Sequence, residues 1–380
     1  MNNTKLSTAL TLNQKITLNI TSLAHGGSGV GRYQDFVIFV PFTCPEDEVQ
    51  VEITSLKKNY GEGRLVNIIT ASPHRTPPPC PVFGQCGGCQ WQHIRYEEQL
   101  KQKQGIIESA LKRTAREEGI EIRPIIPSPK VLHYRNRSEF QIEGSKIGFF
   151  ERGSHSLVEF DQCYIADQKI NLELKKLKGT GYLFSKKVKI YLNQDEMVRS
   201  LNLNSPGEDL GFSQVNTLQN KNIQDYLIKE LSKPQKHNGQ ILDLYCGQGN
   251  FSFPLNDLGW RVRGVDSNAQ GIQVANKAGR SGVTFSVGDV SCEVKKLLKK
   301  KEVFDVILMD PPRTGVDKNL LPLIHELQPE TLIYISCNPT TFARDWERFK
   351  KISQYKIHTL QPFDMFPQTF HVELVAIAKK

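Results

Sequence analysis

Five apolar runs in the C-terminal half constrain the fold of this 380-residue chain more than any other feature. They are ILDLY (241–245), RVRGVD (261–266), VTFSV (283–287), FDVILM (304–309) and TLIYIS (331–336). Each run ends in small or polar residues, and helix-length segments separate the runs. This alternation indicates βαβ units, and therefore an α/β, Rossmann-like domain with a doubly wound parallel sheet. Ligands of such folds bind beyond the carboxyl ends of the strands.

The segment before this domain has a different pattern. Residues 12–70 form short alternating runs separated by Gly, Asp and Pro, which predicts an OB-like β-barrel that binds oligonucleotides. Its glycine-rich stretch AHGGSGVGRYQD, from Ala24, is either a phosphate-binding loop or a plain hairpin. The proline-rich stretch ASPHRTPPPC then marks a linker. We therefore expect a barrel over 12–70, a small central α+β domain over 71–204 and the Rossmann-like domain over 205–380.

The charge balance and the N-terminus restrict the setting of the protein. The chain has 49 Lys and Arg against 40 Asp and Glu, a net charge of +9 that suits a polyanion such as nucleic acid. The polar N-terminus lacks the features of a secretion signal, and the apolar stretches are far too short for a membrane span. We expect a cytoplasmic protein with reduced thiols, without membrane association or an obligate protein partner.

Three cysteines lie close together in the stretch CPVFGQCGGCQWQ. Cys80, Cys86 and Cys89 follow a C-x5-C-x2-C spacing, and Cys163 is the candidate fourth ligand. Four thiolates bind either zinc or an iron–sulfur cluster, and the spacing alone does not separate the two. The remaining cysteines at 44, 246 and 292 are interpreted as packing residues.

The loop after the first apolar run has the features of a nucleoside site. Gly247 and Gly249 let a ligand approach the backbone, and Asp266 ends the next run, where a carboxylate can accept hydrogen bonds from ribose hydroxyls. An NAD site would require a third glycine where the chain has Ser252. S-adenosylmethionine is the better fit, and Asp289 and Asp310 close the following strands at the same edge.

Two further motifs bear on catalysis. MDPPR (309–313) and SCNP (336–339) close neighbouring strands, which places Cys337 at the same edge. A lone cysteine after a strand is often a packing residue, but a partly exposed thiolate is a good nucleophile for a conjugated carbon. His371 and Glu373 head the last apolar strand, where either is a candidate general base or an ordinary strand residue.

The motifs together resemble a known family. FSQVN (212–216), DLYCGQGNF, GVDSN, DPPR, SCNP and DMFPQTFHVE occur in the order found in S-adenosylmethionine-dependent RNA uracil-C5 methyltransferases of bacteria. The resemblance implies that Cys337 is the nucleophile and Glu373 the base. It implies cofactor contacts from Gln214, Tyr245, Asn250, Asp266, Asp289 and Asp310.

The same resemblance extends to the N-terminal part. Residues 12–70 resemble a TRAM domain, and the cysteines resemble the family's iron–sulfur motif, which implies a [4Fe–4S] cluster on Cys80, Cys86, Cys89 and Cys163 rather than zinc. Relatives of this build imply 23S rRNA as the first candidate substrate and the tRNA T-loop as the second. The YRNR segment (134–137) is a candidate for phosphate contacts.

Two rival interpretations are less consistent with the residues. Adenine-N6 methyltransferases also carry D-P-P, but an aromatic residue follows it there, whereas Arg313 follows here and Cys337 would have no task. A non-catalytic RNA-binding protein or chaperone of this fold would not need the cysteine, the carboxylate and the cofactor loop together.

Overall fold

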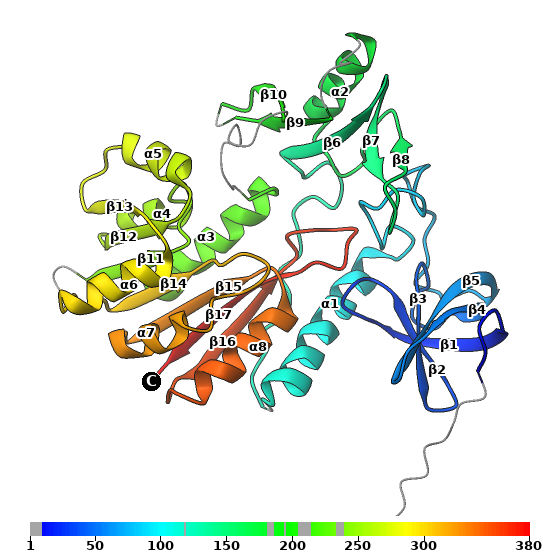
Figure 1. Cartoon of the computed structure of the whole chain (residues 1–380), viewed down its shortest axis with the longest axis horizontal. Helices are drawn as coiled ribbons and strands as arrows, with labels where there is room; N and C mark the ends of the chain where they lie inside the picture. The colour runs from blue at the N-terminus through cyan, green and yellow to red at the C-terminus, as the bar shows by residue number, and fades with distance from the viewer. Residues whose placement is uncertain (1–9, 118, 181–185, 194, 204–213, 233–238) are drawn as a thin grey trace, which may run out of the picture.

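The computed structural model describes residues 10–117, 119–180, 186–193, 195–203, 214–232 and 239–380. Phe212 and Ser213 of the FSQVN motif, and the expected domain start at residue 205, lie outside the described residues. Three groups of elements follow one another along the chain: a barrel, a small antiparallel sheet and a large mixed sheet (Figure 1). Among the described residues, no helix is long and apolar enough to cross a membrane.

The N-terminal group is the predicted barrel. Its strands close in the order β1-β2-β3-β5-β4, and alternate side chains such as Ile16, Leu18 and Ile20 are buried inside it. The strands are β1 (Lys15–Leu23), β2 (Gly29–Tyr33), β3 (Phe36–Val40), β4 (Glu48–Leu56) and β5 (Tyr60–Thr70). The glycine-rich stretch connects β1 to β2, so it is a hairpin.

The central group is a sheet in the order β10-β9-β6-β7-β8 with one helix packed on it. Its elements are β6 (Arg137–Glu143), β7 (Lys146–Phe150), β8 (Leu157–Glu159), α2 (Gln168–Thr180), β9 (Lys187–Leu192) and β10 (Val198–Asn202). Phe140, Phe149 and Phe160 pack together in its core, beside the cysteine segment.

The C-terminal group is the Rossmann-like sheet, in the order β13-β12-β11-β14-β15-β17-β16. Its strands are β11 (Gln240–Leu244), β12 (Arg261–Asp266), β13 (Val283–Val287), β14 (Val306–Met309), β15 (Thr331–Ser336), β16 (Lys356–Phe363) and β17 (Glu373–Lys379). The five predicted strands are parallel, but β17 runs antiparallel to both β15 and β16. The wholly parallel sheet that we expected is therefore wrong at this edge. Residues 364–372 between β16 and β17 are too short for a crossover helix, so the chain must reverse there.

Helices cover both faces of this sheet. Leu242 and Leu244 pack into one apolar cluster and Ile241 into the other, because successive strand side chains point to opposite faces. The helices are α3 (Thr217–Leu231), α4 (Ser252–Asp257), α5 (Ala269–Lys277), α6 (Val290–Lys299), α7 (Leu320–Leu327) and α8 (Pro339–Lys350).

The helix α1 (Tyr96–Ala110), with the π-helical turn η1 (Leu111–Ala115), lies between the barrel and the large sheet (Figure 1). The helical spacing of Leu100, Ile107 and Leu111 in the sequence predicts an apolar face; Ile107 and Leu111 are buried and Leu100 is partly buried, but α1 also buries polar side chains. Lys103 is fully buried and donates from Nζ to Asp364 Oδ1 (2.5 Å) and to the Phe366 carbonyl (3.0 Å). The Tyr96 hydroxyl donates to the other oxygen of Asp364 (2.7 Å).

Replacing Lys103 should test this anchor. Lys103→Met leaves the Asp364 carboxylate buried without its cation, so we expect the free energy of unfolding to fall by about 3–5 kcal/mol. Lys101→Met on the same helix removes an exposed partner of Glu98 (3.6 Å) and should cost less than about 1 kcal/mol. Urea denaturation of both variants checks this. Equal effects would show that the buried pair does not stabilise the fold.

Candidate active site and thiol cavity

The loop after β11 brings a carboxylate to the predicted cofactor edge. Asp266 ends β12, and its two oxygens accept hydrogen bonds from the backbone N–H groups of Gly247 (2.8 Å) and Asn268 (2.7 Å). Gly249 has φ +84°, and a Cβ there would lie 2.7 Å from the Phe253 ring, so the turn requires glycine. These contacts hold the loop against the end of β12, with remaining acceptor capacity on Asp266.

Three carboxylates gather at this edge. Burial first, and then the charges of Asp243 and Asp266, raise the pKa of Asp310 to about 7, although the Gln214 amide donates to it (3.4 Å). Burial and the Asp266 charge likewise raise the pKa of Asp243 to about 7. A cationic ligand here would relieve this repulsion, whereas an anionic pyrophosphate would increase it. The electrostatics therefore favour a sulfonium nucleoside over a dinucleotide.

Ser252, which replaces the third glycine, has a structural partner. Its hydroxyl donates to Asp243 Oδ2 (2.5 Å), and both side chains are buried. The other oxygen of Asp243 has no hydrogen-bond partner among the described residues. Asp243 was absent from the predicted site, because a carboxylate inside an apolar run gives no clear signal in the sequence.

The other predicted cofactor residues are placed at the same edge with different surroundings. Tyr245 follows β11 in the left-handed region (φ +63°) and is half-buried. Asp289 is exposed and caps α6 by accepting from Cys292 N (2.9 Å). The Asn250 side chain exchanges two hydrogen bonds with Asn220 of α3 (2.8 and 2.9 Å), so it joins that helix to the loop.

Strand register places Cys337 opposite Glu373. Ser336 pairs with Leu374 in the antiparallel β15–β17 ladder, and continuing that register by one residue pairs Cys337 with Glu373. The turn carrying Cys337 is fixed on both sides, because Asn338 caps α8 and Ser336 Oγ contacts Asn338. Cys337 is half-buried and Glu373 is 2% exposed.

The surroundings of this pair favour the uncharged forms. Burial, followed by the charge of Glu373, raises the pKa of Cys337 to about 12, and Arg313 opposes the shift. Burial and the Asp310 charge raise the pKa of Glu373 well above its usual value, again opposed by Arg313. Arg313 of the DPPR motif is therefore a functional candidate to which the sequence analysis gave no role.

His371, the second candidate base, has a different environment. Burial and nearby cations, Arg313 foremost, lower its pKa to about 3. Its ring lies 4.1 Å from that of Phe370 and 5.7 Å from that of Phe366. The ring is neutral at physiological pH and packs among aromatic side chains.

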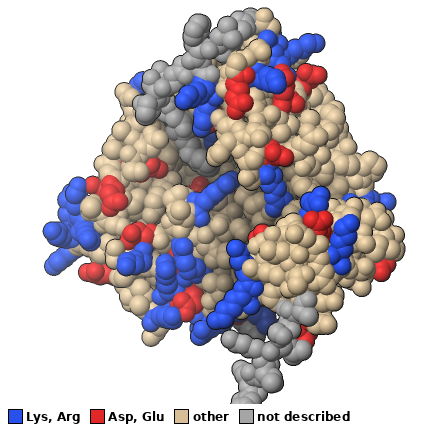
Figure 2. Space-filling view, turned by 45° about the vertical axis from the view of Figure 1, so that its right-hand side comes forward, with Lys and Arg blue, Asp and Glu red and all other residues tan. Residues whose placement is uncertain are grey.

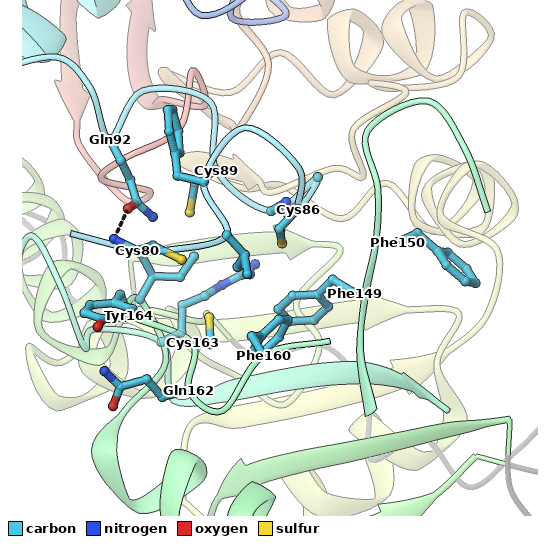
Figure 3. A pocket seen from close by; sticks show the side chains of 16 residues that line it. Cys80, Cys86, Cys89, Gln92, Phe149, Phe150, Phe160, Gln162, Cys163 and Tyr164 are labelled. Carbon is cyan, nitrogen blue, oxygen red and sulfur yellow. Dashed lines mark hydrogen bonds between the residues drawn. The ribbon is translucent and has the colours of Figure 1, made fainter. Parts of the chain in front are cut away.

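The four predicted thiols line a single cavity of about 250 Å³. Figure 3 shows the sulfur atoms of Cys80, Cys86, Cys89 and Cys163 turned toward one common space. Apolar residues such as Val82, Phe149 and Phe160 complete the wall. All eight cysteines of the chain are free thiols in this structure.

Backbone contacts hold the thiols in place. Asn171 of α2 accepts from Cys163 N (2.8 Å) and donates to the Cys163 carbonyl (3.0 Å), and Gly88 N–H donates to Cys86 Sγ (3.4 Å). Burial and the neighbouring thiols raise the pKa of Cys86 to about 11 and that of Cys89 to about 12. Among the described residues, no group of three or more His, Cys, Asp or Glu side chains is close enough to hold one metal ion.

Comparisons with known proteins agree with this site. The family model "tRNA (Uracil-5-)-methyltransferase" matches residues 181–279 and 293–380, and a TRAM domain model matches residues 9–66. An uncharacterised RNA methyltransferase of Bdellovibrio bacteriovorus is 38% identical over 378 residues, covering 96% of this chain and 95% of its own length. One of Halalkalibacterium halodurans is 31% identical, with 95% of each chain covered.

The chain belongs to the RNA uracil-5-methyltransferase family. It is an S-adenosylmethionine-dependent RNA uracil-C5 methyltransferase with a TRAM domain. Among solved structures, the tRNA (uracil-54, C5)-methyltransferase of Pyrococcus abyssi, in complex with S-adenosyl-L-homocysteine, superposes with a TM-score of 0.69 at 25% identity. That match covers 96% of this methyltransferase and 100% of the archaeal chain.

The charges around Cys337 predict opposite effects of two substitutions on its alkylation by iodoacetamide. Glu373→Gln removes a side chain whose negative charge, once ionised at alkaline pH, raises the pKa of Cys337, so alkylation should be about threefold faster at that pH. Arg313→Gln removes the opposing cation and should slow it. Peptide mass spectrometry follows Cys337, with the exposed Cys292 as internal reference. Changes of the same sign in both variants would contradict the assignment of charges.

Proposed function

We propose that this methyltransferase modifies C5 of a specific uridine in 23S rRNA through a covalent bond between Cys337 and C6 of the uracil. The observation that carries the proposal is the register that sets Cys337 opposite Glu373, next to the three carboxylates of the cofactor edge. Uracil C5 is too weak a nucleophile to take a methyl group unaided, so a thiolate must first add to C6.

The residues divide the reaction between them. The Cys337 thiolate forms a bond to C6, and the electrons of the C5–C6 double bond move toward O4. S-adenosylmethionine would be held by Gln214, Tyr245, Asn250, Asp266, Asp289 and Asp310; it would supply the methyl group to C5 and leave as S-adenosylhomocysteine. The Glu373 carboxylate then removes the C5 proton, the double bond returns and the S–C6 bond breaks. Arg313 stabilises the anionic forms of both residues.

The domain composition and the net charge bear on the RNA target. Family members that combine a TRAM domain with the cysteine motif mostly act on large-subunit rRNA, which makes 23S rRNA the first candidate. The tRNA T-loop is the second, because the similar archaeal structure is a tRNA uracil-54 enzyme. The net charge of +9 suits either RNA, and Figure 2 shows Lys and Arg side chains along the recess between the barrel and the rest of the molecule.

The thiol cavity fits a cluster better than one ion. Four thiols are the donor set of both zinc and a [4Fe–4S] cluster, but these thiols surround a space of about 250 Å³ and are too dispersed for a single ion. A metal centre would also favour the thiolate forms that burial opposes. We propose that the protein is cytoplasmic and holds a [4Fe–4S] cluster whose role is structural or in RNA handling, since the methyl transfer has no redox step.

Labelled S-adenosylmethionine should distinguish the substrates. We expect labelled 5-methyluridine from unmodified 23S rRNA fragments. Label in a tRNA transcript instead would identify the tRNA T-loop as the substrate. Cys337→Ala should abolish transfer, because it removes the thiol that adds to C6. Glu373→Gln should form the adduct but fail to release it, giving an RNA–protein band on a denaturing gel. Transfer by Cys337→Ala would refute the covalent mechanism.

Metal analysis tests the cluster. Protein purified without oxygen should be brown and contain about four iron and four sulfide per chain. Cys163→Ser should lose iron, whereas Cys292→Ser, which alters an exposed cysteine away from the cavity, should retain it. A colourless protein that contains stoichiometric zinc would show that the site binds zinc and not an iron–sulfur cluster.

A further inference from the structure

Residues 133–136, which we call the junction segment, run beside the chain that carries Cys163. Backbone N–H groups of His133 and Arg135 donate to the carbonyls of Tyr164 (2.9 Å) and Ile165 (2.9 Å). Asp167 N–H returns a bond to the Arg135 carbonyl (2.9 Å). The His133 backbone is left-handed (φ +53°). This conformation persists because the hydrogen bonds of His133 and Arg135 hold the surrounding backbone in place. The junction segment and the Cys163 loop therefore form one unit.

The next residue of the junction segment reaches the cofactor edge. Asn136 N–H donates to the Val215 carbonyl (2.8 Å), and its side-chain amide donates to the Gln214 carbonyl (2.9 Å) and the Thr217 hydroxyl (2.9 Å). Gln214 in turn donates to Asp310 (3.4 Å). Asn136 thus fixes the backbone from which Gln214 points at the cofactor edge.

Two other side chains of the segment, those of Tyr134 and Arg135, also face inward. The Tyr134 hydroxyl donates to the Pro367 carbonyl (3.1 Å) in the loop that leads to Glu373. Arg135 lines the thiol cavity, and its charge lowers the pKa of Cys89 and Cys163 against the effect of burial. Its buried Nε has no hydrogen-bond partner among the described residues. Tyr134 is 6% exposed, and the phosphate contacts expected for the YRNR segment (134–137) stay a prediction.

We propose that the junction segment couples the thiol cavity to the cofactor site, and that Asn136 is the positioning residue of this coupling. A metal centre bound by Cys163 restrains residues 163–166, which restrain residues 133–135 and, through Asn136, Gln214. Filling the thiol cavity then raises the affinity for the S-adenosyl nucleoside in the absence of RNA, and the reverse holds by linkage. This inference rests on the proposed metal centre.

Calorimetric titration with S-adenosylhomocysteine, without RNA, tests the positioning role. Asn136→Ala should weaken binding about tenfold, within the range usual for coupled sites, while iron content and the cluster absorbance stay unchanged. Asn202→Ala changes an exposed residue at the end of β10 in the central sheet, and this variant should bind the nucleoside as the wild type does. Unchanged affinity in Asn136→Ala would overturn the proposal.

A double-mutant cycle tests the coupling itself. Cys163→Ser should weaken binding in the wild-type background and have little further effect in Asn136→Ala, because the path is already broken. Additive losses would overturn the coupling. Iron and sulfide are measured on the same samples. If the wild type contains neither iron nor sulfide, both the cluster and the coupling are overturned. If the wild type contains the cluster, but the iron-free Cys163→Ser variant binds the nucleoside with the same affinity, the coupling alone is overturned. Failure of the loaded wild type to bind the nucleoside at all would instead contradict the proposed function.

Discussion

The antiparallel pairing of β15 with β17 is the constraint on which the active site depends. It alone brings Glu373 to Cys337, since the two residues lie at the ends of different strands and meet only in this register. A slip of one residue would turn every side chain of β17 to the opposite face and remove the carboxylate from the thiol. The connection 364–372 therefore has to be held firmly, and the buried Lys103–Asp364 pair of α1 holds it.

The carboxylates at the cofactor edge of the sheet lower the stability of the unliganded fold and favour the binding of a cation. Burial and the neighbouring carboxylate charges raise the pKa values of Asp243 and Asp310, which costs folding free energy in the absence of a ligand. A cation bound at this site would be attracted by the same carboxylates and would relieve their repulsion. Asp310 also disfavours the thiolate of Cys337, so a cationic cofactor would bring the nucleophile closer to its reactive form. Binding and activation thus share one electrostatic source.

Sequence patterns predicted the parallel strands, the barrel and the edge at which the acids gather, because burial and period are local properties of the chain. They could not predict the direction of β17, since an apolar run reads the same in either direction. The polar face of α1 was missed for a similar reason: Lys103 looks like a solvent-facing residue until its partner, 261 positions away, is known. Asn136 received no role of its own within the YRNR segment, because its hydrogen bond to the Gln214 carbonyl is visible only in three dimensions.

Hydrogen bonds through Trp91 join the barrel to the loop 364–372, which leads to Glu373. Trp91 Nε1–H donates to the Gly27 carbonyl (3.0 Å), and Trp91 N–H donates to the Gln368 carbonyl (3.0 Å). Gly27, at φ +90°, approaches so closely that a Cβ would lie 2.9 Å from Gln90 and 3.2 Å from Phe370. Gly27 of the glycine-rich hairpin is thus needed for this close contact. RNA held by the barrel would meet Cys337 at a distance that the fold sets in advance, which reduces the entropy lost when a uridine enters the site.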